Sequence, residues 1–216
     1  MTEVVIREIE GSSQQAQPSR LTREDWLKAA RDVLLSKGVE QVKIMTLARA
    51  IGGSRSSFYW FFKDRQDLLD ELFQHWLSTN TNAIVEQAQR PSASISQAVL
   101  QVFECWVDDA VFDARLDFAV REWARRAPEI RAALDKADQE RVEALEAMFT
   151  SHGFEETEAF VRARTLYFMQ IGYYALEVDE TIDERLKLVP TYVFNFSGEW
   201  PAESDLSRFA KIAMKS

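Results

Sequence analysis

The segment RSSFYWFFKDR, residues 55–65, places five consecutive aromatic residues between basic side chains. Arg55 precedes the aromatic run at positions 58–62, and Lys63 and Arg65 follow it. Arginine can form a bidentate pair with O6 and N7 of guanine, and lysine or arginine can neutralise phosphates. The serine and tyrosine hydroxyls of the segment can bond phosphates or base edges. These residue types in this spacing indicate nucleic-acid binding.

Several helices are expected to position this segment. Thr22 can cap a first helix that ends at Gly38, and a short helix is expected over residues 44–51. Gly52-Gly53 interrupts it, Ser54 can cap a second short helix that carries the aromatic residues, and Asp64 can cap a longer one. Two short helices with a glycine-containing break, braced by longer helices, predict a helix-turn-helix whose second short helix enters the major groove.

The second short helix should have two different faces. Phe58 and Phe62 are four residues apart and can pack against the first short helix, with Phe61 beside them. Arg55, Ser56, Tyr59 and Trp60 fall largely on the opposite face. We expect Phe58 and Phe62 in the core and Arg55 and Tyr59 at DNA, whereas Trp60 fits either face.

The rest of the chain shows apolar residues at helical spacing and no sustained alternation of apolar and polar residues. Helices are expected over 95–110, 116–127, from Pro128 to Gly153, over 158–177, from a Thr181–Glu184 capping box onward, and around 206–212. Pro190 is expected to kink the helix that follows Thr181, or to end its first part. The prediction is therefore an all-α protein.

The charge is unevenly distributed along the 216 residues. The net charge is −9, yet residues 20–65 carry +5, residues 66–216 carry −12 and residues 1–19 carry −2. Residues 1–20 are expected to form a flexible arm, since residues 11–20 are polar and low in complexity. A basic segment ahead of an acidic one favours DNA binding by the former, with Arg20 and Arg23 extending its basic surface.

Other function classes lack their signatures in this sequence. The single cysteine, Cys105, cannot form an intrachain disulfide, and no signal peptide or apolar run of membrane-spanning length occurs, so a cytoplasmic location is expected. No metal-ligand spacing, phosphate-binding glycine loop or nucleophile elbow is present. An all-α enzyme is the less favoured alternative, and no cofactor, metal or membrane partner is expected.

The stretch LARAIGGSRSSFYWFFKDRQDLLDEL, residues 47–72, resembles the DNA-binding signature of the TetR family of transcriptional regulators. The resemblance covers most of residues 21–75 with unbroken spacing. It implies a DNA-binding domain over 21–66 and a helical effector-binding and dimerisation domain over 67–216. The sequence departs from the family pattern at Phe61, where a phosphate-contacting histidine is frequent, and at Lys43, where a serine or threonine commonly caps the first short helix.

The resemblance also implies roles for individual residues. The residues expected to contact DNA are Lys43, Arg55, Ser56, Ser57, Tyr59, Trp60, Lys63 and Arg65. The last two long helices, roughly 157–177 and 182–196, should form a homodimer interface; they carry Tyr167, Ile171, Tyr174, Tyr192, Val193 and Phe196.

Aromatic residues of the acidic part are candidates for an effector pocket. The residues expected to bind a small molecule are Phe103, Trp106, Phe118, Trp123, Tyr167 and Tyr173, although simple core packing explains each of them as well. The function implied is a repressor that leaves a palindromic double-stranded DNA operator when an effector binds. The same fold with a protein partner, or with no effector, is the alternative.

Overall fold

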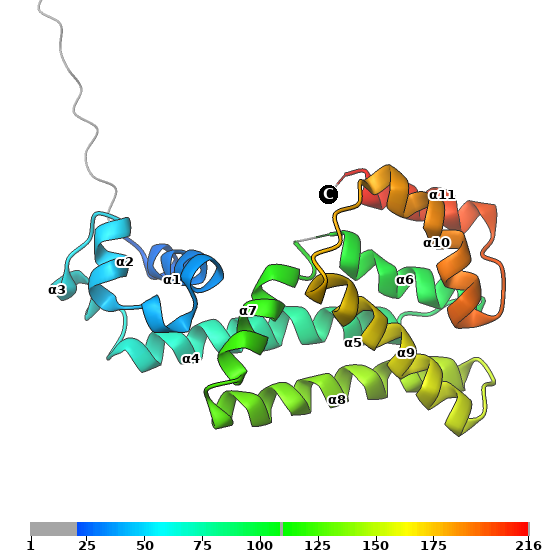
Figure 1. The fold of residues 1–216 in the computed structure, drawn as a ribbon, viewed down its shortest axis with the longest axis horizontal. Coiled ribbons are helices and arrows are strands. Elements are labelled where there is room, and N and C mark those ends of the chain that lie inside the picture. Colours follow the sequence, from blue (N-terminus) through cyan, green and yellow to red (C-terminus); the bar gives the residue numbers. More distant parts are fainter. Residues whose placement is uncertain (1–20, 109, 216) are drawn as a thin grey trace, which may run out of the picture.

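The computed structural model describes residues 21–108 and 110–215, and every regular element within these ranges is helical. The predicted arm, residues 1–20, lies outside the described residues. At one end of the molecule, α1 (Arg23–Lys37), α2 (Ile44–Ala50) and α3 (Arg55–Phe58) gather into a small unit that we call the head. The short turn η1 (Val39–Gln41) connects α1 to α2, and Figure 1 shows the head projecting away from the other helices.

Side-chain caps begin α1, α3 and α4 at the predicted residues. The Thr22 hydroxyl accepts a hydrogen bond from Asp25 N, and the Asp25 carboxylate accepts one from Thr22 N, which makes a capping box for α1. Ser54 and Ser57 form the same motif at α3, and Asp64 accepts from Asp67 N at the start of α4 (Arg65–Trp76). Each cap satisfies a backbone N–H that the helix itself cannot pair.

The helix α4 continues without a break into the rest of the molecule. A π-helical turn, η2 (Leu77–Thr81), follows it directly and leads into α5 (Asn82–Gln89). Neither η2 nor α5 was predicted, because polar residues that favour caps and turns fill positions 78–82. Asn80 and Thr81 are nevertheless buried, so tertiary contacts rather than helix propensity hold this turn.

The remaining helices form a larger unit that we call the body, which comprises α5–α11. Its helices after α5 are α6 (Ile95–Val107), α7 (Ala114–Ala124), α8 (Pro128–Ser151), α9 (Glu156–Ala175), α10 (Ile182–Ser197) and α11 (Glu203–Ala213). The expected all-α fold is confirmed, as are the first-turn proline of α8 and the Thr181–Glu184 capping box of α10. No helix in the described part of the chain is sufficiently long and apolar to cross a bilayer.

One expectation about the body is wrong in part. The helix α10 does not end at Pro190 but runs through it to Ser197. A proline in a helix interior removes one backbone hydrogen bond. The loss is tolerated here because Val189 and Val193, on either side of Pro190, are buried against the core.

The buried apolar residues form two clusters. One cluster joins α5, α6, the C-terminal half of α8 and α9–α11. The other joins the head helices and α4 to α7 and the N-terminal half of α8, with Leu116, Val120 and Trp123 as the α7 contribution. The helix α7 therefore packs against the head from the body side, between the head and the rest of the body (Figure 1).

Candidate nucleic-acid interface

The helix α3 is only four residues long and depends on aromatic anchors for its position. Phe58 is fully buried, and its ring contacts Trp26 edge-on and Phe62 in a stack, at centroid distances of 5.2 and 5.3 Å. The expectation that Phe58 and Phe62 are core residues is confirmed. A helix this short is not stable alone, so these contacts hold its exposed face in place.

The residues that could read DNA are exposed on α3 and in the turn that follows it. Trp60 is 84% exposed and Tyr59 46% exposed, and Arg55 and Ser56 are also exposed. Ser57 is half-buried, and its hydroxyl donates to the Ser54 carbonyl oxygen at 2.8 Å as part of the α3 cap.

Further basic residues surround α3. Lys43, at the N-terminus of α2, and Lys63, between α3 and α4, are both exposed. Arg49 in the last turn of α2 is exposed as well. The sequence analysis did not single out Arg49, although it lies within the stretch that resembles the family signature.

Two basic residues, Arg65 and Arg23, were expected to add to this basic surface. Their side chains instead form hydrogen bonds and ion pairs within the protein. Arg65 donates to the carbonyl oxygens of Val42 and Val39, at 2.5 and 2.7 Å, and so ties the start of α4 to the turn before α2. Arg23 pairs with Glu71 and lies 4.4 Å from the centroid of the Phe62 ring. The carboxylate of Glu71 offsets the charge of Arg23, so the expectation that Arg23 extends the basic surface is not supported; Arg20 lies outside the described residues.

Residues 27–72 match the family model described as "Bacterial regulatory proteins, tetR family". Through this segment the chain resembles the TetR family. Members of this family are transcriptional regulators rather than enzymes; they bind operator DNA and form homodimers.

Solved structures of TetR regulators share the fold along nearly their whole length. One is the regulator PfmR from Thermus thermophilus, with a TM-score of 0.62, 17% identity, and coverage of 85% of this chain and 99% of that one. Another is AmtR from Mycobacterium smegmatis, with a TM-score of 0.59, 14% identity, and coverage of 94% and 98%. A TetR/AcrR family regulator from Thermobifida fusca gives a TM-score of 0.57, 17% identity, and coverage of 80% and 96%.

The two departures from the TetR signature have visible structural consequences. Phe61 is half-buried, and its side chain packs against the apolar cluster that includes the head helices. Its carbonyl oxygen accepts a hydrogen bond from Arg23. Lys43 occupies the N-cap position of α2 without a side-chain capping bond. Its ammonium group is therefore exposed where the TetR pattern usually has a hydroxyl.

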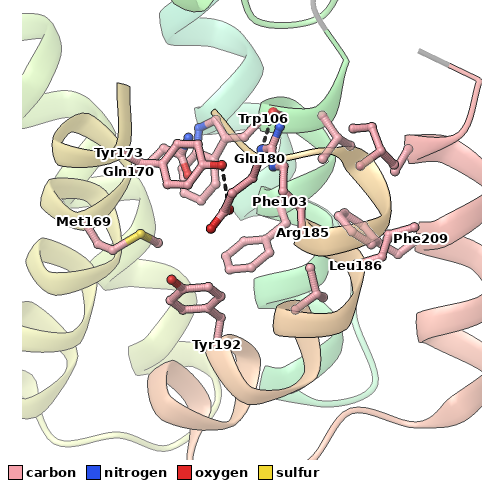
Figure 2. A pocket seen from close by; sticks show the side chains of 14 residues that line it. Phe103, Trp106, Met169, Gln170, Tyr173, Glu180, Arg185, Leu186, Tyr192 and Phe209 are labelled. Carbon is pink, nitrogen blue, oxygen red and sulfur yellow. Dashed lines mark hydrogen bonds between the residues drawn. The ribbon is translucent and has the colours of Figure 1, made fainter. Parts of the chain in front are cut away.

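A small pocket in the TetR-like body lies between α6, α9, α10 and α11, and we call it the C-terminal pocket (Figure 2). Three residues predicted to bind an effector line it, namely Phe103, Trp106 and Tyr173. Its volume is about 50 Å³, which is space for a few water molecules.

The polar groups of the C-terminal pocket are few. The Tyr173 hydroxyl donates to Glu180 at 2.9 Å, and burial together with this bond raises the pKa of Tyr173 to about 12. Arg185 lies 5.3 Å from the centroid of the Tyr173 ring and donates to the Trp106 carbonyl oxygen. Gln170 is buried, and its side-chain N–H donors have no hydrogen-bond partner.

The other three predicted effector residues lie elsewhere. Phe118 and Trp123 line a groove of about 790 Å³ between α7 and the end of α1 and η1, which we call the junction groove. Tyr167 is 1% exposed and belongs to a group of buried charged residues. The structure thus brings together only Phe103, Trp106 and Tyr173 of the six.

A group of charged residues around Tyr167 was not predicted. We call it the buried charge cluster; its members are Asp117 and Arg141, which are buried, Arg121 and Asp138, which are partly buried, and Tyr167. Arg141 is fully buried and donates to Asp117 at 3.0 Å and to the Tyr167 hydroxyl at 2.9 Å. Burial alone would raise the pKa of the Asp117 carboxyl, but Arg141 and Arg121 outweigh it and hold this pKa below its usual value.

The buried charge cluster also contacts the rod formed by α4, η2 and α5. The Trp76 indole donates to Asp117 at 3.0 Å, and Arg141 donates to the Thr81 hydroxyl at 3.2 and 3.1 Å. Near it, Asn80 donates to the carbonyl oxygen of Asp113, and Asp113 pairs with Arg31 of α1. A connected set of polar contacts therefore links the rod, α7, α8 and α9, with α1 joined through Asp113.

The face of α9 and α10 that was expected to form the TetR-type dimer interface is partly apolar and exposed. Its exposed apolar residues are Phe160, Val161, Phe168, Leu188 and Tyr192. Of the residues named from the sequence, Tyr167, Val193 and Phe196 are instead buried within the subunit. Arg164 lies 5.1 Å from the ring centroids of both Phe160 and Phe168, which fixes these rings relative to each other on α9.

Proposed function

We propose that this TetR-like protein represses transcription by binding a palindromic operator as a homodimer, and that a small molecule releases it. The observation that carries the DNA-binding part is the two-faced α3. Phe58 and Phe62 anchor it, while Arg55, Tyr59 and Trp60 face solvent at the end of the molecule. A recognition helix needs this arrangement to place side chains on base edges in the major groove.

Within this proposal, residues 21–66 form the DNA-binding domain and residues 67–216 the effector-binding and dimerisation domain. Base contacts fall to Arg55, Ser56 and Trp60, phosphate contacts fall to Lys43 and Lys63, and Tyr59 lies beside Arg55 on the same DNA-facing surface. The bonds of Arg65 to Val39 and Val42 and the capping bonds of Ser57 favour structural roles for these two residues, so any DNA contact they make would use their remaining polar groups.

We place the proposed effector in the C-terminal pocket. Its walls are mostly aromatic and aliphatic, and the unpaired N–H donors of Gln170 offer a bond to an acceptor group on the ligand. Pockets for drug-sized ligands usually have volumes of about 300–1,000 Å³, so the walls must move apart for such a ligand to enter. This opening supports a switch. If the ligand binds the opened body more tightly and the operator binds the closed one more tightly, the ligand lowers the affinity for the operator, and the operator lowers the affinity for the ligand by the same factor.

The DNA-binding part is tested by selecting bound duplexes from a random pool. A palindromic consensus with half-sites about one helical turn apart is expected, and its affinity should fall steeply with salt. Charge reversal at Lys43, Arg55 and Lys63 should abolish binding, whereas reversal of the exposed body residue Arg131 serves as the control. Selection without a consensus, or unchanged binding after reversal at the head, would refute operator recognition.

The effector is tested by mass analysis of small molecules extracted from the purified protein, followed by operator titration in their presence. Release of the duplex by an extracted compound supports the proposal. If no extracted or added compound changes operator affinity, regulation by a protein partner, or by no effector, is the better account.

A further inference from the structure

The exposed side chain of Arg55 contacts the side chain of Tyr59. Its Nη2 donates at 3.3 Å to the hydroxyl of Tyr59, the C-cap residue of α3 four positions along the chain. The centre of its guanidinium group lies 5.8 Å from the centroid of the Tyr59 ring. Arg55 is therefore held on one side by both the ring and the hydroxyl of a neighbour at the i+4 position.

Tyr59 is itself supported from the core. Its ring meets the ring of Phe58 edge-on, with centroids 5.5 Å apart and an interplanar angle of 83°. Phe58 is fully buried against Trp26 and Phe62. A chain of ring contacts thus runs from the core of the head through Phe58 and Tyr59 to the guanidinium of Arg55.

The start of α3 is fixed as well. Ser54 and Ser57 exchange capping bonds of 3.0 Å, which set the backbone on which Arg55 is the first helical residue. A flexible arginine side chain loses much rotamer freedom when it binds a base, and a side chain that is already ordered loses less.

We infer that Tyr59 is a positioning residue that presets Arg55 for reading a guanine in the operator. This inference rests on the proposed function, because it concerns how the same recognition helix reads DNA. A guanidinium carries five N–H donors, so the bond to Tyr59 leaves enough donors for a bidentate pair with guanine O6 and N7. Tyr59 contributes to the choice of base through Arg55, not through a base contact of its own.

A different role for Tyr59 gives a different result. If its hydroxyl bonded a phosphate instead, its loss would weaken binding to all duplexes by a similar factor. If it presets Arg55, its loss should lower the preference for guanine at one position. The ratio of affinities for two duplexes that differ at this position therefore separates the two roles.

The experiment compares wild type, R55A, Y59F and the double variant by fluorescence anisotropy. The duplexes are the selected operator and versions in which each guanine in turn becomes adenine; the position whose discrimination R55A removes is the Arg55 site. Y59F keeps the ring and removes only the hydroxyl, so folding should be preserved, as thermal unfolding would verify. T150A, which removes an exposed hydroxyl at the end of α8 in the body, is the control.

We expect Y59F to lower discrimination at the Arg55 site about three- to tenfold, as one hydrogen bond implies. In the R55A background, Y59F should cause no further loss. An equal loss of affinity for both duplexes, additive effects in the double variant, or no guanine whose recognition depends on Arg55 would overturn the inference. Failure of the wild type to select any duplex would instead refute the proposed function, and this inference with it.

Discussion

Asp117 and Arg141 show how single residues hold this molecule together away from DNA. Both are buried, and they meet at 3.0 Å where α7, α8 and the end of α4 come together. Removal of one partner from a buried pair leaves the other charge without compensation, which is far more costly than loss of an exposed pair.

Replacement of Asp117 by asparagine should lower the free energy of unfolding at pH 7 by about 3–5 kcal/mol. The effect should depend on pH, because the pKa of Asp117 is lowered in the folded protein. Its ionised form therefore stabilises the fold above the ordinary carboxyl pKa, about 4, and this contribution is lost as the pH falls further, through the lowered pKa. Urea unfolding across this range should show the difference between wild type and D117N shrink.

The control is Asp135, which pairs with Arg131 at the surface of α8. D135N should change the free energy of unfolding by less than about 1 kcal/mol. A difference for D117N that stays constant down to strongly acidic pH would contradict the assigned charge of Asp117.

At the residue scale, the pairing within the buried charge cluster could not be predicted from the sequence. Asp117 and Arg141 each lie on an amphipathic helix, where a charged residue is usually exposed. Their pairing follows from how α7 packs on α8, which periodicity does not specify. Tyr167 was predicted to bind an effector or to lie in the dimer interface. Its hydrogen bond to Asp138 depends on how the helices pack, which the sequence pattern does not specify.

At the scale of the elements, local signals predicted the starts of α1, α3 and α4 well. Thr22, Ser54 and Asp64 each begin a helix because their side chains bond the backbone nearby, and such bonds depend only on neighbouring residues. The turn η2 has no such local signal. Its buried Asn80 is held by Asp113, which lies 33 residues further along the chain.

The turn between α2 and α3 depends on Gly53. A Cβ atom there would lie 2.9 Å from Leu21 Cδ1 and 3.1 Å from Trp26 Cζ2, and Trp26 is fully buried. We expect G53A to lower the free energy of unfolding by about 1–3 kcal/mol through this crowding, and to weaken operator binding by displacing α3. Thermal unfolding and duplex titration measure the two effects.

The neighbouring Gly52 gives a matched control. Its φ of 68° favours glycine, but no atom lies within 4 Å of a Cβ placed there. Asparagine tolerates this backbone conformation, so G52N should affect stability less than G53A does. Equal effects would mean that backbone conformation, not close packing, governs the turn.

At the scale of the whole molecule, the exposed apolar residues of α9 and α10 predict how two copies meet. Phe168 is 51% exposed and is part of the stripe with Phe160 and Arg164. F168E should convert the dimer to a monomer, because a charged residue at the centre of an apolar interface is left desolvated. Sedimentation would show the change, and operator affinity should fall with it, since one head can reach only one half-site.

Met214 provides the comparison for this experiment. It is 67% exposed and lies just beyond α11, away from the α9 stripe. M214E should leave the mass in solution and the affinity for DNA unchanged. Persistence of a dimer in F168E would place the interface elsewhere.

The expected function class followed from the head and the start of α4, since the resemblance to the TetR signature covers most of residues 21–75, and the matched family model covers residues 27–72. Ligand-binding residues of the body were harder to predict from the sequence, because the spacing of an aromatic residue on a helix does not distinguish a residue that lines a pocket from one that fills the core. Phe103 and Trp106 reach the C-terminal pocket, whereas Phe118 and Trp123 reach the junction groove, and only the arrangement of the helices separates them.

The pairing of buried charges also restricts which substitutions this protein can tolerate as its sequence diverges. Asp117 and Arg141 face each other fully buried in the buried charge cluster, so a variant that lost either one would carry an uncompensated charge in its interior. Replacement of both by apolar residues of similar volume can be neutral, whereas loss of one alone is strongly destabilising. We therefore expect Asp117 and Arg141 to be retained or exchanged together in descendants of this protein, while the exposed surface around them varies.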